Sequence, residues 1–241
     1  MKNFLQDLVS HTHPLLTIVR VTASDDKISI DSLSEDQTVI LSATTHKTIP
    51  NLVGTFGMPN IHKLDLHLKC PEYRDNANIS IISESRGGVQ IPTGIHFKNE
   101  SGDFENDYRF MSREIIDLKL QTVEFAGAKW NVSFTPTQLN IQRFKLQAAA
   151  HTEQTLFKVE TKDNNLIFSF GDLNTHAGSF VFEQNIAGSL RTPKAFPKTP
   201  VMAVLSLDGD KVLKISDSGA LQITVDSGIA EYNYIFPAFN I

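Results

Sequence analysis

The stretch TPTQLNIQRFKLQAAAH, residues 135–151, predicts an α-helix between two regions of strand character. Ile141, Phe144 and Ala148 recur at i, i+3 and i+7, the spacing at which side chains share one face of a helix. Pro136 suits the first turn of such a helix, because proline is tolerated there. A helix framed by strands indicates an α+β fold.

The same stretch carries Arg143 and Lys145 but no acidic residue, although the whole chain has a net charge of −5. Solvated helix faces ordinarily mix both signs of charge. The periodicity leaves open which polar strip of this helix faces water, the one with Arg143 or the one with Lys145. The charge imbalance therefore bears on a partner rather than on the fold.

Three further segments favour helices: residues 1–13, 59–70 and 194–207. When Lys and Arg are counted against Asp and Glu, the four helical segments together carry +5, so the rest of the chain carries −10. We therefore expect positively charged helices on a negatively charged scaffold.

Strand-rich segments follow these helices. They are residues 15–33, 37–46, 78–85, 122–134, 155–172, 180–188, 211–226 and 231–239. Polar turn residues divide three of them into hairpins, at Ser24–Lys27, Asp163–Asn165 and Asp217–Gly219. FGMPN, residues 56–60, is interpreted as a turn ahead of the second helix. A short helix followed by strands thus recurs, twice in each half of the chain.

Residues 98–122 are polar and acidic at their start and show no clear period, so we interpret them as the link between two halves. The predicted division is an N-terminal domain over 1–110, a connector over 111–122 and a C-terminal domain over 123–241. Each half is long enough for a core of its own. The chain has 16 phenylalanines against one tryptophan, which indicates cores filled by phenylalanine.

Catalytic and nucleotide-binding signatures are missing from the sequence, which contains no GxSxG, GxxxxGK[ST], GxGxxG or HExxH motif. His11 and His13 have no obvious carboxylate or thiol partner beside them. His62 and His67 are five residues apart, whereas neighbours on a helix face are three or four apart. The lone Cys70 forms no disulfide within the chain. We expect no catalytic residue, no metal site and no cofactor.

Three stretches carry a resemblance to a known family: GTFGMPNIHKL (54–64), FPKTPVMAVLSL (196–207) and GIAEYNYIFPAF (228–239). They resemble the second helix, the fourth helix and the closing strand of the DNA polymerase sliding clamp of tailed phages of the myovirus type. Their order and spacing match that family, and the similar layout covers nearly the whole chain.

The resemblance implies a DNA-clamp fold with two similar domains, each with two helices packed on antiparallel sheets. It also implies that three copies close head to tail into a ring around double-stranded DNA. Cations on the helices lining the hole would contact phosphates without reading the base sequence. The residues expected to face phosphates are Lys63, Lys69, Arg143, Lys145, Lys194 and Lys198, with His62, His67 and Lys2 as weaker candidates.

Such a clamp tethers the replicative DNA polymerase to its template as a processivity factor, performs no chemistry, and is opened by a separate ATP-dependent clamp loader. In that family, partners insert a hydrophobic peptide near the connector and the C-terminal region. The residues expected to receive it are Phe110, Ile115, Leu118, Ile235, Phe236, Pro237 and Phe239. The lack of a signal peptide and of an apolar run of about 18 residues predicts a location in a cytoplasm, and the resemblance implies that this is the cytoplasm of the infected bacterial host.

Two alternatives stay open at this point. The hairpins and the phenylalanine-rich core would suit a β-rich phage structural or carbohydrate-binding protein, in which the acid-poor helices are incidental. A small hydrolase would need a catalytic pair such as His151 and Glu153. The clamp is the leading hypothesis because acid-poor helices recur at 136–151 and 194–207.

Overall fold

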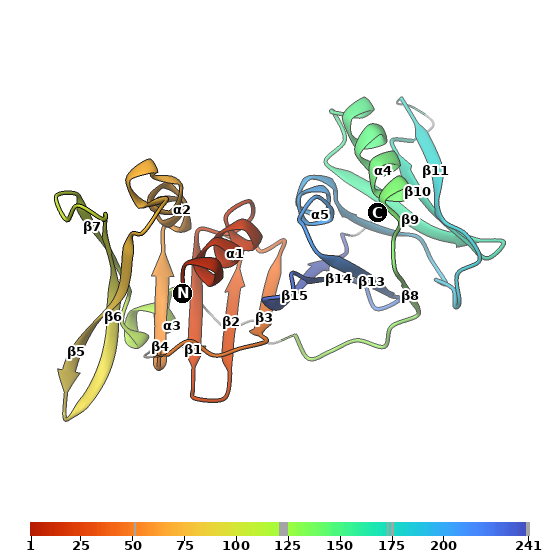
Figure 1. Ribbon diagram of the computed structural model, residues 1–241. Helices are drawn as coiled ribbons and strands as arrows, with labels where there is room; N and C mark the ends of the chain where they lie inside the picture. The colour runs from red at the N-terminus through yellow and green to blue at the C-terminus, as the bar shows by residue number, and fades with distance from the viewer. Residues whose placement is uncertain (51, 121–124, 173, 175, 240–241) are drawn as a thin grey trace. The chain divides into compact units, whose positions relative to one another are not determined.

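The computed structural model describes residues 1–50, 52–120, 125–172, 174 and 176–239 (Figure 1). The chain divides into two compact units. The first comprises Met1–Gln37, Leu41–Val123 and Ser227–Tyr232, and the second comprises Thr38–Ile40, Glu124–Asp226 and Asn233–Ile241. Each unit therefore includes a short segment from a distant part of the sequence.

The first unit is built from helices and two sheets. In chain order its elements are α1 (Lys2–Thr12), β1 (Ile18–Ala23), β2 (Ile28–Leu33), β3 (Ile40–Thr45), β4 (Gly54–Pro59), α2 (Ile61–Lys69), the 3-10 helix η1 (Pro71–Tyr73), β5 (Asn78–Arg86), β6 (Val89–Lys98), β7 (Glu105–Arg109) and α3 (Arg113–Lys119). One sheet has the order β4-β1-β2-β3, and the other has the order β5-β6-β7. The last strand of the chain, β15 (Ala230–Pro237), lies next to β3 and gives its residues up to Tyr232 to this unit.

The second unit has the same kind of construction. Its elements are β8 (Val132–Phe134), α4 (Gln138–Ala150), β9 (Leu156–Lys162), β10 (Asn165–Phe170), β11 (Gly178–Glu183), β12 (Lys194–Pro197), α5 (Lys198–Leu205), β13 (Asp210–Ser216), β14 (Ala220–Asp226) and the remainder of β15. One sheet has the order β11-β10-β9-β12, and in the other β15, β14, β13 and β8 follow one another.

One motif, a helix followed by three strands, occurs four times along the chain (Figure 1). It comprises α1 with β1–β3, α2 with β5–β7, α4 with β9–β11, and α5 with β13–β15. Three motifs are preceded by an additional strand: β4 before α2, β12 before α5 and β8 before α4. Each additional strand pairs antiparallel with a strand of another motif, β4 with β1, β12 with β9 and β8 with β13. The predicted α+β class is confirmed.

Helix α4 lies within the stretch 135–151, where a helix is predicted. Its N-cap is Thr137, whose hydroxyl accepts a hydrogen bond from Asn140 N at 3.2 Å. The stripe Ile141, Phe144 and Ala148 is buried, as the spacing predicts. Phe144 lies in a cluster of rings with centroids 4.9 to 6.5 Å from its own, formed by Phe157, Phe168, Phe170 and Phe182. The core of the second unit is filled by phenylalanine, which confirms that expectation.

Two segments differ from the sequence-based prediction. Residues 56–60, interpreted as a turn, belong to β4 except for the last, because Gly57 serves close packing rather than a reversal of the chain. The predicted link over 98–122 contains β7 and α3, which lack a visible period because each buries few side chains. The fourth helix begins at Lys198, inside the predicted segment 194–207, and Pro200 lies in its first turn, where its missing N–H is tolerated.

Helix α3 docks on β4 at Gly57. A Cβ atom at Gly57 would lie 2.7 Å from Ile116 Cδ1, and Ile116 is fully buried. Gly57 and Met111 exchange two backbone hydrogen bonds, of 3.0 and 2.8 Å, just before α3 begins. Arg20 of β1 adds an ion pair to Asp117 of α3 at 3.1 Å. The absence of a side chain at Gly57 therefore allows α3 to lie against the sheet.

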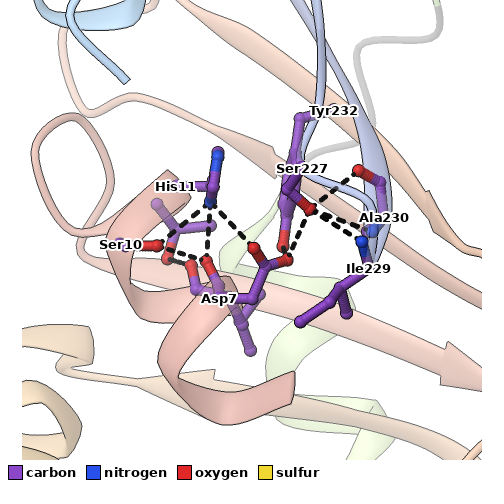
Figure 2. A network of polar contacts seen from close by, with 9 residues as sticks. Asp7, Ser10, His11, Ser227, Ile229, Ala230 and Tyr232 are labelled. Carbon is purple, nitrogen blue, oxygen red and sulfur yellow. Dashed lines mark hydrogen bonds and ion pairs between the residues drawn. The ribbon is translucent and has the colours of Figure 1, made fainter. Parts of the chain in front are cut away.

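The first helix is tied to the last strand by a buried carboxylate. Asp7 Oδ2 accepts hydrogen bonds from Ser227 Oγ at 3.0 Å and from the Tyr232 hydroxyl at 2.8 Å (Figure 2). The ring of His11 stacks on that of Tyr232, with centroids 4.5 Å apart. The Asp7 side chain is 9% exposed, so these bonds replace most of its contact with water.

We expect Gly57→Ala to displace α3, because the new methyl group would overlap Ile116. Overpacking of this kind costs about 1–3 kcal/mol of the free energy of unfolding. Hydrogen exchange at amides 113–119 should become faster. In an Ile116→Ala background the same glycine substitution should have little further effect, and an equal effect in both backgrounds would contradict the contact.

Asp7→Ala should lower the free energy of unfolding by about 2–3 kcal/mol, since it removes a charged acceptor from two buried hydroxyl donors. Asp7→Asn keeps one acceptor oxygen and should cost less. Urea denaturation of the full chain measures both values. An unchanged midpoint for Asp7→Ala would show that the network contributes nothing to stability.

Candidate nucleic-acid interface and partner surface

The helices of each unit pack in pairs, α1 on α2 and α4 on α5, and each buries one side against the strands. Their opposite sides form two candidate interfaces, one in each unit, which we call the helix faces. The exposed residues on these faces are Asn3, Gln6, Ser10, His62, Lys63, Leu66, Lys69, Gln138, Leu139, Gln142, Arg143, Leu146, Ala149, Ala150 and Thr199.

The helix faces contain neither of the two acidic residues of these helices. The only acidic residues within α1, α2, α4 and α5 are Asp7 and Asp65. Their side chains are 9% and 12% exposed, respectively. Asp65 accepts a hydrogen bond from Lys69 Nζ at 2.6 Å. The helix faces therefore present cations and uncharged groups without an exposed carboxylate, a stronger asymmetry than the sequence count indicates.

Four of the six predicted phosphate contacts lie on α2 and α4. Lys63, Lys69 and Arg143 are exposed, and Lys145 is half-buried. The exposed side of α4 holds Gln142 and Arg143, one from each of the two polar strips that the periodicity could not separate. Asn140 shares a strip with Arg143 but turns inward, where its side chain donates to Glu183 at 3.0 Å.

Lys198, predicted to face phosphates, has a different role. It is 6% exposed, and its ammonium donates to the carbonyl oxygens of Ala148 at 3.2 Å and of His151 at 2.5 Å. These carbonyls lie at the C-terminal end of α4, where helical acceptors lack intrahelical donors and the helix dipole is negative. In this structure the Lys198 ammonium is therefore buried and bonded within the unit, and it is not on the helix faces.

The remaining cationic candidates are also engaged within the protein. Lys194 lies on β12 rather than on a helix, and its Nζ donates to Thr192 Oγ1 at 2.8 Å. Lys2 Nζ donates to the carbonyl oxygens of residues 73 and 74 at 2.8 and 2.6 Å. The ring of His67 stacks on Phe97, and burial, with a smaller effect of Lys63, lowers its pKa, so His67 favours the neutral form.

The half-buried Lys145 lies close enough to Lys211 to affect it. Lys211 Nζ donates to the carbonyl oxygens of Leu207 and Gly209, the latter at 3.0 Å. Burial lowers the pKa of the Lys211 ammonium, Asp208 opposes that shift, and repulsion from Lys145 adds to it. Asp210 also opposes the shift, so Lys211 lies among two carboxylates and the ammonium group of Lys145.

The predicted peptide-binding residues of the connector surround α3. Ile115 and Leu118 are exposed, the latter at 82%, and the ring of Phe110 stacks on Phe56 with centroids 4.3 Å apart. A cavity of about 480 Å³ includes Phe110 in its lining, and another of about 770 Å³ includes Leu118. Met111 lines both, so α3 is bordered by two hollows within the first unit, and the one beside Leu118 also has polar residues such as Glu35 and Lys119 in its lining.

The predicted peptide-binding residues near the C-terminus belong to the second unit. Pro237 and Phe239 are exposed, and Phe239 N donates to Ala195 O at 2.9 Å. Phe236 is fully buried and Ile235 nearly so. Phe236 is therefore a core residue of this structure, whereas Pro237 and Phe239 are the predicted residues that lie at the surface.

The candidate hydrolase pair is not arranged for catalysis. His151 is buried, with its ring stacked on Phe170 and its Nδ1 atom 2.9 Å from the carbonyl oxygen of Gln147. Glu153 is exposed, and a hydrogen bond from its own backbone lowers its pKa. Among the described residues, no helix is long and apolar enough to cross a membrane.

Solved structures share this arrangement over the full chain. PCNA from Thermococcus kodakaraensis superimposes with a TM-score of 0.70 at 9% identity, over 99% of this chain and 97% of that one. The PCNA of A. fulgidus, solved with the C-terminal region of FEN-1 bound, gives 0.73 at 9% identity, over 100% and 96%. This chain has the PCNA fold. Proliferating Cellular Nuclear Antigen from Entamoeba histolytica gives 0.71 at 11% identity, over 99% and 96%.

The PCNA fold is recognisable here from structure alone. No protein-family model matches the chain, and no curated protein matches it by sequence. At identities of 9 to 11%, the likeness rests on the order and placement of the elements. The predicted DNA-clamp fold, with paired helices on antiparallel sheets, is confirmed.

Lys198→Met should lower the free energy of unfolding by about 1–3 kcal/mol, because it keeps the apolar stem and removes the donor that satisfies two helix-end carbonyls. Urea denaturation measures the loss. Binding to duplex DNA at temperatures where the variant is folded should stay unchanged. A stable variant with weaker DNA binding would restore Lys198 as a phosphate contact.

Proposed function

We propose that the chain is a sliding clamp: a ring of three copies that encircles duplex DNA and tethers the replicative DNA polymerase as a processivity factor, without catalysis of its own. The observation that carries the proposal is the combination of the PCNA fold over the full chain with helix faces that expose cations and no carboxylate. DNA carries a phosphate charge about every 1.7 Å along its axis, so a surface that holds it must be positive.

Closure into a ring is supported by the order of the strands. Within the chain, β3 and β15 are the last strands of the first and fourth motifs, and they lie side by side. The last strands of the second and third motifs, β7 and β11, stand at the ends of their sheets. Edge strands present unpaired backbone groups. We propose that β7 of one copy joins β11 of the next, a head-to-tail contact that closes after three copies.

Phosphate contacts in the proposed ring come from Lys63, Lys69, Arg143 and Lys145, and Lys194 stays a candidate at the margin. The excess of ten negative charges outside the four predicted helical segments would disfavour DNA on the other surfaces. Contacts to phosphates alone read no base sequence, so such a ring can slide.

Partners of the proposed clamp are the replicative polymerase and an ATP-dependent loader. We propose that their peptides bind beside α3, at Phe110, Ile115 and Leu118, and near the exposed C-terminal residues of the second unit. The cavities at α3 support this, and in a solved structure the PCNA of A. fulgidus binds the C-terminal region of FEN-1. The resemblance of three stretches to phage clamps supports a role in the cytoplasm of an infected bacterium.

Threading onto DNA with open ends tests the proposal. The wild-type chain should form a trimer by light scattering and should thread onto a linear duplex through a free end. It should then be retained only when streptavidin blocks the ends after threading, because an encircling ring slides off an open end. Lys63→Glu combined with Arg143→Glu and Lys145→Glu should reduce retention at least about tenfold, because nine cations per ring become anions. The trimer should persist.

Lys162→Glu supplies the matched control, since Lys162 is an exposed lysine on β9 outside the helix faces. It should leave retention unchanged. Equal retention on duplexes with blocked and free ends would contradict encirclement, as would a chain that stays monomeric. An undiminished signal from the triple variant would contradict the assignment of the helix faces to DNA.

A further inference from the structure

Three potential metal ligands converge where α1 and α2 meet. His13 follows α1 directly, and its Nε2 atom lies 3.0 Å from Nδ1 of His62 at the start of α2. Asp65 is three residues beyond His62, so the two share a face of α2. One ligand atom from each of the three side chains lies within 4.8 Å of the others.

The chemistry of this group suits zinc. Zn²⁺ binds imidazole nitrogens at about 2.0–2.1 Å, and a tetrahedral angle then separates two such nitrogens by roughly 3.3 Å. The observed 3.0 Å differs from that value by a few tenths of an ångström, which small rotations of the rings would supply. Two imidazoles and one carboxylate form a donor set that zinc takes with a further position left open.

We propose that His13, His62 and Asp65 bind one Zn²⁺ ion that links α1 to α2. The carboxylate is positioned for this role, because its side chain is only 12% exposed and Lys69 holds one of its oxygens at 2.6 Å. Outer partners of this kind orient a metal-binding carboxylate. A cavity of about 380 Å³, lined in part by His13, Asp65 and Lys69, leaves room for water at the open position.

Without an ion, the two rings share a hydrogen bond in which one ring nitrogen donates to the other. Zinc binding requires both of these nitrogens to be unprotonated. The donor ring meets that requirement when its hydrogen moves to its other nitrogen, so no net proton has to leave the imidazoles. Zinc would take the place of the hydrogen that lies between the two rings, and the Asp65 carboxylate would balance part of the charge of the ion.

Zinc titration of the chelator-treated full chain tests the site, with calorimetry for affinity and Co²⁺ absorption in the visible range for ligand geometry. We expect one ion per chain and the intense bands of a four- or five-coordinate cobalt ion. His13→Gln and His62→Gln should each weaken binding at least about tenfold, since even outer partners of a metal site contribute 10- to 100-fold.

The matched control is His46→Gln, because His46 is an exposed histidine after β3 and lies on neither helix. It should bind zinc as the wild type does. The site is overturned if the wild type binds no ion at a one-to-one ratio, or if His46→Gln weakens binding as much as His62→Gln does. The exposed position of His62 makes its variant a test that keeps the fold, and circular dichroism checks this. The measurement uses no DNA, so its outcome is separate from that of the proposed clamp function.

Discussion

Each pair of helices has to bury one side against its strands, and this packing decides which charges the protein exposes. The two carboxylates of the paired helices go inward, where Asp7 meets two hydroxyl donors and Asp65 meets Lys69. Lys198 also goes inward, to the carbonyls at the end of α4. What stays outside is a set of cations and uncharged side chains. The charge of the helix faces thus follows from which charged side chains form hydrogen bonds in the interior.

The sequence predicts the parts of the fold that depend on repeated burial. The stripe of α4 and the hairpin turns are visible because several side chains share one face, or because turn residues such as Asp163 and Asn164 take positive φ angles. Helix α3 was missed because it buries chiefly Ile116, and β4 because two of its six residues are glycines. A single buried side chain gives no period to detect.

Candidate site residues were predictable by type but not by surroundings. Arg143 and Lys198 look alike in sequence, since each is a cation on an acid-poor helix, yet one is exposed and the other caps a helix end. Only a contact between α4 and α5 separates them. The histidine cluster shows the same limit, because His13 and His62 are 49 residues apart. Only the packing of α1 on α2 brings His13 to His62 and Asp65.

The division of β15 between the two units has a consequence for biosynthesis. Asp7 finds its partners 220 and 225 residues later, so α1 completes its contacts only after β15 has left the ribosome. Contacts of such long separation slow folding and prolong the exposure of unpaired strands in the nascent chain. The first unit therefore completes its packing late in translation, and a chain shortened by its final fifteen residues would lack the partners of Asp7 and the strand beside β3.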